Sequence, residues 1–125
     1  MIGIDLIKTS RMHKLMERFG KKALLRFLCE EEIEIVKNSK SAAAYWAVKE
    51  AFSKALGTGI GARCNFHDMK IYKNKDGAPK LALSKKLVEE FQITDTALSI
   101  THDGEYAVAV VSIQTSTTPD KIQEF

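Results

Sequence analysis

One long helix-forming stretch, residues 41–56, constrains the fold of this 125-residue chain more than any other feature. Three consecutive alanines near its start favour helix strongly, and neither glycine nor proline interrupts it. Ser41 can act as the N-cap, and Gly57 and Gly59 are placed to end the helix. The sequence therefore predicts one long helix that ends in a glycine-rich turn.

The part of the chain before this helix predicts one strand and three shorter helices. Residues 3–7 alternate with the period of a strand, although the strand carries the acid Asp5. A helix follows, capped by Thr9 or Ser10 and ended by Gly20, with one apolar stripe made by Met12, Leu15, Met16 and Phe19. Residues 23–28 and a segment that begins near Glu30 are predicted to be helical as well.

The part after the long helix is predicted to be rich in strands. Residues 68–73 and 80–83 form a hairpin around the turn at Gly77, and residues 84–91 form a short helix. Strands at 97–101 and 106–113 are joined by a turn, and the second is apolar enough to be central in a sheet. The prediction is an α+β fold, with an antiparallel sheet packed on helices and one domain over residues 1–114. Residues 115–125 are polar and contain Pro119, so a mobile tail is expected.

Several features limit the class of protein. No apolar run approaches the roughly 20 residues that cross a bilayer, and the first residues do not resemble a secretory signal, so we expect a cytoplasmic protein without a membrane. Cys29 and Cys64 match no metal-binding spacing and are interpreted as free thiols, although the sequence leaves a disulfide open.

Basic residues are concentrated early in a chain whose net charge is only +3. Between positions 8 and 26 the single acid is Glu17, and the seven basic residues are Lys8, Arg11, Lys14, Arg18, Lys21, Lys22 and Arg26. Such a cluster attracts an anionic partner: nucleic acid, a membrane surface, a phosphorylated ligand or an acidic protein. A solvated helix face is the alternative that needs no partner.

The long helix carries the side chains that are best suited to binding a metal or a phosphate. Trp46, Glu50 and Lys54 are four residues apart and form one ridge. Glu50 and Lys54 could simply form a pair worth about 0.3–0.5 kcal/mol. The same geometry could instead hold Mg²⁺ on the carboxylate and a phosphate on the lysine, while the glycines that follow allow a bulky ligand to approach.

A magnesium site needs a second carboxylate, and Asp5 is the natural candidate. An unpaired acid in an apolar strand is costly if it is buried, so Asp5 needs a partner there. The alternative is an Asp5 that faces solvent at the edge of the sheet.

These residues resemble the paired signature of the 4′-phosphopantetheinyl transferases. Gly3-Ile4-Asp5 and the segment 46–59 (WAVKEAFSKALGTG) are similar to its two motifs, most of all in the short single-domain bacterial group, the holo-acyl-carrier-protein synthases. Weaker similarities occur in the expected order at 26–28, 66–68, 77–79, 98–102 and 106–110, so the resemblance covers residues 2–113. It implies Mg²⁺-dependent transfer of 4′-phosphopantetheine from coenzyme A to a serine of an apo-acyl-carrier protein, with release of 3′,5′-ADP.

The resemblance also implies roles for particular residues. Asp5 and Glu50 would hold Mg²⁺, Lys54 would contact the phosphates, and Glu50 or, second, Asp5 would take the serine proton. Coenzyme A would contact Lys54, Gly57, Thr101 and His102. His13 and His67 are interpreted as structural.

The resemblance implies two protein partners. An acidic carrier protein would dock on Arg11, Arg18 and Arg26, assisted by Lys14 and Lys22. A homotrimer would form with active sites between subunits. No nucleic acid is expected, because aromatic residues do not interleave with the basic cluster as a base-stacking surface requires.

Two positions depart from the family pattern. Tyr45 stands where arginine is common, which puts one contact to the anionic ligand in doubt. Cys29 stands where threonine or serine is common, so the helix that contains Glu32 would lose a hydroxyl cap at a cost of about 1 kcal/mol. Two alternative functions stay open: a non-catalytic basic module that binds nucleic acid or an acidic protein, and an inactive homologue.

Overall fold

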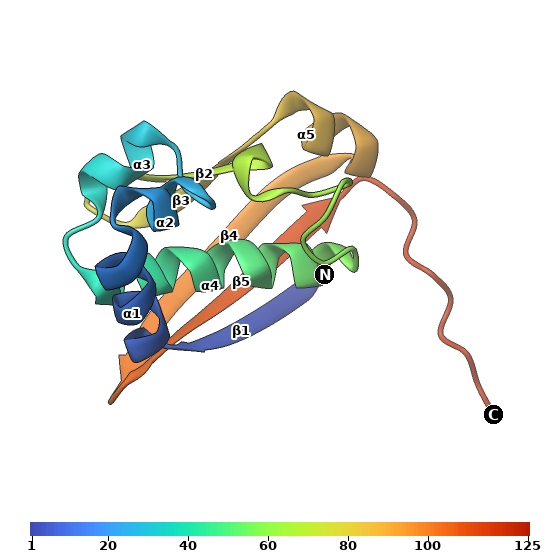
Figure 1. Ribbon diagram of the computed structural model, residues 1–125. Helices are drawn as coiled ribbons and strands as arrows, with labels where there is room; N and C mark the ends of the chain where they lie inside the picture. Colours follow the sequence, from blue (N-terminus) through green and yellow to red (C-terminus); the bar gives the residue numbers. More distant parts are fainter.

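The computed structural model describes residues 1–125 and confirms the predicted α+β architecture (Figure 1). One antiparallel sheet has the strand order β1-β5-β4, formed by β1 (Ile2–Lys8), β5 (Tyr106–Thr115) and β4 (Ile93–Asp103). A separate hairpin pairs β2 (Met69–Lys73) with β3 (Pro79–Leu83). The helices are α1 (Thr9–Phe19), α2 (Lys21–Leu25), α3 (Glu30–Ile35), α4 (Ser39–Leu56) and α5 (Lys85–Phe91), with a 3₁₀ turn η1 (Phe66–Asp68). The strand predicted to be central, β5, lies between the other two.

The long helix α4 lies across one face of the three-stranded sheet (Figure 1). Small residues of β5, Ala107 and Ala109, are fully buried beneath it. At Gly3 the approach is closer still, since a Cβ there would collide with the carbonyl oxygen of Ala51 and lie 2.6 Å from the amide nitrogen of Ala55. Strand β1 therefore packs its backbone directly against α4, which brings the neighbouring Asp5 under the helix.

Helices α1, α2 and α3 gather at the N-terminal end of α4, whereas α5 lies at the far end of the molecule (Figure 1). Residues 116–125 form no regular secondary structure and extend away from the sheet. Cys29 and Cys64 are free thiols, as expected. No helix has both the length and the apolar character that a membrane crossing requires.

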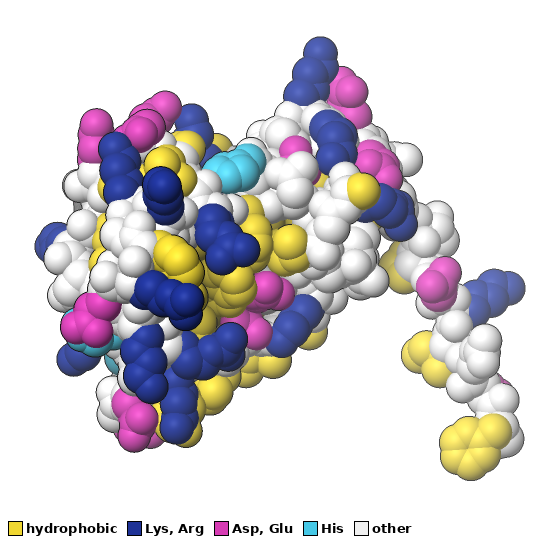
Figure 2. Space-filling view, in the orientation of Figure 1, with side chains coloured by type: hydrophobic (Ala, Val, Ile, Leu, Met, Phe, Trp, Pro, Cys, Tyr) yellow, Lys and Arg dark blue, Asp and Glu magenta, His cyan; other side chains and the backbone are white.

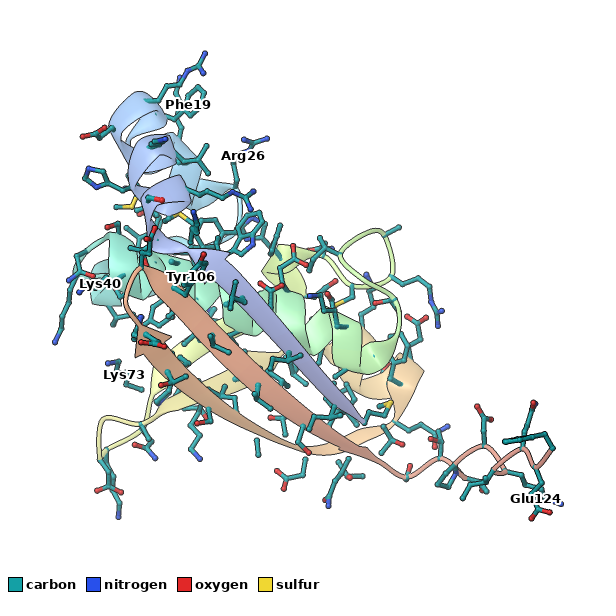
Figure 3. The ribbon with its side chains drawn as sticks, turned by 90° about the horizontal axis from the view of Figure 1, so that it is seen from below. Phe19, Arg26, Lys40, Lys73, Tyr106 and Glu124 are labelled. Atoms are coloured by element: carbon teal, nitrogen blue, oxygen red, sulfur yellow. The ribbon has the colours of Figure 1, made fainter.

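The other face of the sheet is covered by no helix (Figure 3). Ile2, Ile4 and Leu6 of β1 point to this side and are 72%, 58% and 58% exposed. Val108 and Val110 of β5 pair with Leu6 and Ile4 in register, so they extend the apolar surface. The predicted alternation of β1 is present, but Ile2, Ile4 and Leu6 lie on the open side while Ile7 is buried. At position 3, α4 leaves room only for glycine.

Two predicted helix caps were wrong. Helix α1 begins directly after Lys8, and no side chain caps it. Helix α4 begins two residues earlier than predicted, with Asn38 as its cap: the Ser41 amide donates to Asn38 Oδ1 at 3.0 Å, and the Asn38 amide donates to Ser41 Oγ at 3.1 Å. Ser41 is thus the third residue of a capping box, a pattern that satisfies two amides at once. Strand β4 is longer than the predicted 97–101 because it pairs along nearly all of β5.

Candidate active site

The surface of α4 shows where the helix can meet a ligand. Within residues 42–55 every side chain is buried except Trp46, Glu50 and Lys54. Their spacing of four places them on one line along the helix. The predicted ridge is therefore confirmed as the part of this helical stretch that the fold leaves uncovered.

Lys54 forms its ion pair with β1. Its Nζ donates to Asp5 Oδ1 at 2.8 Å and to the carbonyl oxygen of Ile4 at 3.2 Å. No ion pair joins Lys54 to Glu50, so the simple pair within α4 is not formed. The Asp5 side chain is only 13% exposed, and the predicted need for a partner is met by this lysine.

Glu50 completes a cluster of two carboxylates and one ammonium group. Partial burial raises the pKa of the Glu50 carboxyl, the negative charge of Asp5 raises it further, and Lys54 acts in the opposite direction. The two acids are thus near enough to repel each other. Nowhere does the chain gather three or more His, Cys, Asp or Glu side chains as a metal cage. Two carboxylates, completed by substrate phosphates and water, are a usual donor set for Mg²⁺, so these residues fit that ion.

The glycine turn lies directly beyond Lys54. Gly57 ends α4 with φ 83°, a left-handed conformation that favours glycine. The amides of Thr58 and Gly59 both donate to the carbonyl oxygen of Ser53, at 3.2 and 3.1 Å. Gly57 is exposed, so the backbone beside Lys54 is open to a ligand.

Thr101 and His102 do not join this cluster within one chain. Thr101 pairs with Val108, which pairs with Leu6, so its side chain lies on the open face of the sheet, opposite Asp5. His102 lies on the α4 side, but it is two strands across and two residues along from Asp5, which places their Cα atoms on the order of 12 Å apart. Both residues are exposed. Asp5 and Thr101 thus lie on opposite faces of the sheet.

The sequence did not reveal that Lys49 is a fully buried residue of the same helix. Its Nζ donates to Glu32 Oε1 at 2.9 Å and to the carbonyl oxygens of Phe27 and Phe66 at 2.6 and 3.1 Å. Burial lowers the pKa of Lys49, and the bond and charge of Glu32 oppose that change. Helical periodicity could have indicated this position, because Lys49 shares a face with the apolar Tyr45 and Phe52.

The partner of Lys49, Glu32, is fully buried as well. Its Oε1 accepts from the Cys29 amide at 2.9 Å, and its Oε2 accepts from the Ile71 amide at 2.9 Å. Glu32 thus forms a capping box at the start of α3, with Cys29 as the N-cap residue. Burial, followed by the charge of Glu32, raises the pKa of the nearby Tyr45, so the phenol is neutral and offers no positive charge to a ligand.

An apolar pocket lies between the ridge and the basic helices. Its volume is about 360 Å³, and it is lined by Leu15, Ala23, Arg26, Phe27, Trp46 and Phe66. The Trp46 ring lies 5.1 Å from that of Phe27 and 4.8 Å from that of Phe66, measured between centroids. The pocket thus connects Trp46, the first residue of the ridge, to the surface formed by α1 and α2.

The predicted docking residues form an unpaired basic surface on and directly after α1 and α2. All are exposed, and none forms an ion pair within the chain: Arg11, Lys14, Arg18, Lys22 and Arg26. By contrast, Lys21 is paired with Glu30 at 2.8 Å. Figure 2 shows Lys and Arg side chains gathered around an apolar area on this side of the molecule, and Figure 3 shows Phe19 and Arg26 projecting from it.

Known proteins share this arrangement of sequence and fold. Residues 1–111 match the 4′-phosphopantetheinyl transferase superfamily. A holo-acyl-carrier-protein synthase of Sulfurimonas denitrificans is 62% identical over 122 residues, which are 98% of this chain and 100% of that protein. The crystal structure of the Helicobacter pylori holo-acyl-carrier-protein synthase in complex with coenzyme A matches with a TM-score of 0.88 at 43% identity, over 91% of this chain and 100% of that one. A synthase of Bacillus anthracis in complex with coenzyme A (3′,5′-ADP) matches with a TM-score of 0.76 at 35% identity, over 92% and 96%.

The chain belongs to the 4′-phosphopantetheinyl transferase superfamily. Its similarity is to the holo-acyl-carrier-protein synthases within that superfamily, which confirms the resemblance predicted from the two motifs.

Proposed function

We propose that this chain is a holo-acyl-carrier-protein synthase that transfers 4′-phosphopantetheine from coenzyme A to a serine of an apo-acyl-carrier protein. The serine Oγ forms a bond to the β-phosphorus of coenzyme A, the bond from that phosphorus to the bridging oxygen breaks, and 3′,5′-ADP leaves. The observation that carries the proposal is the cluster of Asp5, Glu50 and Lys54 on the uncovered line of α4. The relatives that share the fold and sequence act on the same carrier-protein substrate by name, and two were solved with coenzyme A.

Asp5 and Glu50 would hold Mg²⁺, which offsets negative charge on the pyrophosphate and on the departing 3′,5′-ADP. Lys54 would donate to a phosphate oxygen from the same side. Gly57 would let the phosphates approach the backbone. Positioning and charge compensation supply most of the rate in phosphoryl transfer, which suits a site built from acids and a lysine.

Glu50 is the first candidate to accept the serine proton. Burial and the charge of Asp5 raise its pKa, which makes it a better base than an ordinary carboxylate. Asp5 is the second candidate, although its Oδ1 already accepts from Lys54.

A second copy of the chain would complete the coenzyme A site. Thr101 lies on the open face of the sheet and Asp5 lies beneath α4, so a ligand held between two copies could contact Asp5 of one copy and Thr101 of the other. A shallow hollow of about 520 Å³, lined by Ile2, Gly3, Ile4, Lys54 and Val110, connects the acid cluster with this face. We propose that these interfaces lie on the open apolar face, within the homotrimer that the resemblance to the family implies.

The carrier protein would dock on the unpaired basic surface of α1 and α2, next to the apolar pocket at Trp46. Acidic side chains of the carrier would meet the arginines, and the pocket would receive an apolar side chain. A cytoplasmic location belongs to this proposal, since two free thiols suit a reducing compartment.

The test is the intact mass of an apo-acyl-carrier protein after incubation with this chain, coenzyme A and Mg²⁺. We expect a gain of one phosphopantetheine with the wild type and with the control Glu89→Ala. Glu50→Ala and added EDTA should abolish it. A folded wild type that modifies no carrier protein would contradict the proposal and favour a non-catalytic basic module.

A further inference from the structure

The Lys54 ammonium contacts the Asp5 carboxylate, which a metal ion at this site would also bind. Lys54 Nζ lies 2.8 Å from Asp5 Oδ1, although Glu50 is one helical turn away on the same ridge. We propose that the Lys54 ammonium and a divalent cation compete for the Asp5 carboxylate, so that the metal binds well only when a pyrophosphate takes the lysine. This inference rests on the proposed function, which assigns Asp5 and Glu50 to the metal.

The two cations disfavour each other on electrostatic grounds. A Mg²⁺ ion lies about 2.1 Å from a carboxylate oxygen, so an ammonium on either oxygen of the same carboxylate would be roughly 4–6 Å from it. Like charges at such a separation repel strongly when the site is partly shielded from water. Asp5 is shielded in this way, with 13% of its side chain exposed.

Lys54 is the member of the pair that can move. Its side chain is 52% exposed, and its only other partner is the carbonyl oxygen of Ile4, at 3.2 Å. The backbone at Asp5 is fixed, because β1 pairs with β5 on both sides of it. Ile4 pairs with Val110, and Leu6 pairs with Val108. A phosphate oxygen beside the ridge would give the ammonium a new acceptor at little cost in conformation.

The arrangement makes coenzyme A and the metal depend on each other. Before the pyrophosphate arrives, Lys54 neutralises Asp5 and limits the charge repulsion between Asp5 and Glu50. Once a phosphate holds the lysine, both carboxylates are available to a divalent cation. Metal affinity should therefore rise when coenzyme A is present, by linkage between the two ligands.

The test measures Mn²⁺ binding by the electron paramagnetic resonance signal of the free ion, without coenzyme A. We expect Lys54→Met and Lys54→Gln to bind Mn²⁺ about three- to tenfold more tightly than the wild type, because the competing ammonium is gone. Lys8→Met removes the same charge from the end of the same strand, where the lysine faces Glu105 at 3.9 Å, and should change the affinity less than twofold. Equal affinities of the wild type and both Lys54 variants would overturn the inference.

A second readout follows the lysine itself. In ¹⁵N-labelled wild type, the Nζ resonance that Lys54→Met lacks should shift with coenzyme A and Mg²⁺ together, and little with Mg²⁺ alone at concentrations below saturation. A full shift produced by low Mg²⁺ alone would contradict the competition.

The proposed function is checked on the same samples. Asp5→Asn should weaken Mn²⁺ binding at least tenfold, and the wild type should modify an apo-carrier protein. If either fails, the assignment of the site fails. If both hold while the Lys54 variants bind Mn²⁺ as the wild type does, only the role of Lys54 in competition is wrong.

Discussion

At the scale of single residues, Gly3 sets the distance between the strand that carries Asp5 and the helix that carries Glu50. A side chain at this position would meet the backbone of Ala51, which cannot move without displacing α4. We predict that Gly3→Ala lowers the free energy of unfolding by about 1–3 kcal/mol, as overpacking does, and reduces transfer activity because Asp5 shifts. Urea denaturation and the mass assay measure the two effects. Gly61→Ala is the matched control, since a Cβ there meets nothing within 4 Å and its backbone is not left-handed.

The ionised Glu50 carboxylate should destabilise the folded protein, although the proposed reaction requires it. Because its pKa is raised by burial and by Asp5, the folded protein holds this proton more tightly than the unfolded chain does. The contribution of the carboxyl to stability is therefore full below its unfolded pKa and is lost as the pH rises through the raised pKa. At pH 7, Glu50→Gln should abolish transfer and raise the unfolding midpoint by about 1–2 °C, a gain that disappears near pH 4. Thermal unfolding at both pH values tests this, with Glu89→Gln as control; a midpoint that falls at pH 7 would refute it.

Sequence reasoning identified the acid cluster but not its internal pairing. Asp5, Glu50 and Lys54 were predicted together from a strand, a helical spacing and a resemblance. The partner of Lys54 could not be decided, because the choice between Glu50 and Asp5 depends on how closely β1 approaches α4. That approach depends on the absence of a side chain at Gly3, a contact between residues about 50 positions apart in sequence.

At the scale of elements, the buried pair of Lys49 and Glu32 joins α4 to α3 and connects both helices to three other parts of the chain. It connects the end of α2 through Phe27, the η1 turn through Phe66 and β2 through Ile71. Two of these, Phe27 and Phe66, contribute the rings that pack on Trp46. The pair therefore holds the walls of the apolar pocket in place.

Removing both partners of this pair should cost less stability than the two single removals added together. Lys49→Met leaves Glu32 charged and buried, and we predict a loss of about 3–5 kcal/mol in the free energy of unfolding. Lys49→Met combined with Glu32→Gln should lose less than the sum of the two single changes. Urea denaturation followed by the fluorescence of Trp46, the one tryptophan in the chain, measures the coupling. Additive losses would mean that the pair does not act as a unit.

The order and type of the elements were predictable because each has a local cause. Alternation marked the strands, and alanine content together with the glycine turn marked α4. The starts of α1 and α4 were less predictable. Several polar residues stand near each start, and only the assembled backbone selects Asn38 over Ser41 as the cap of α4.

At the scale of the whole molecule, the open face of the sheet is the feature that a single chain leaves unexplained. Ile4 lies midway along the edge strand β1, exposed next to β5, and it lines the hollow beside Lys54. From the proposed homotrimer we predict that Ile4→Glu reduces the mass in solution from three chains to one. Transfer activity should fall at least tenfold, since Thr101 would no longer meet the acid cluster of another copy. Ile122→Glu makes the same substitution in the tail, where the side chain is also exposed, and should change neither property. Light scattering after size-exclusion chromatography gives the mass; a wild type that is monomeric and fully active would refute the shared site.

The basic surface and the acid cluster lie on different elements, so the two substrates should respond independently to charge. Arg11 belongs to α1 and has no acidic partner, whereas the phosphates of coenzyme A would meet Lys54 on α4. We predict that Arg11→Glu raises the KM for the carrier protein about five- to thirtyfold at low salt and leaves the KM for coenzyme A within twofold. The difference should shrink as salt is added, because exposed charges are screened over about 8–10 Å at physiological ionic strength. Lys85→Glu makes the same change in charge on α5 and serves as the control. Steady-state kinetics at two salt concentrations measure all of these values, and an equal loss for both substrates would place the carrier protein elsewhere on the molecule.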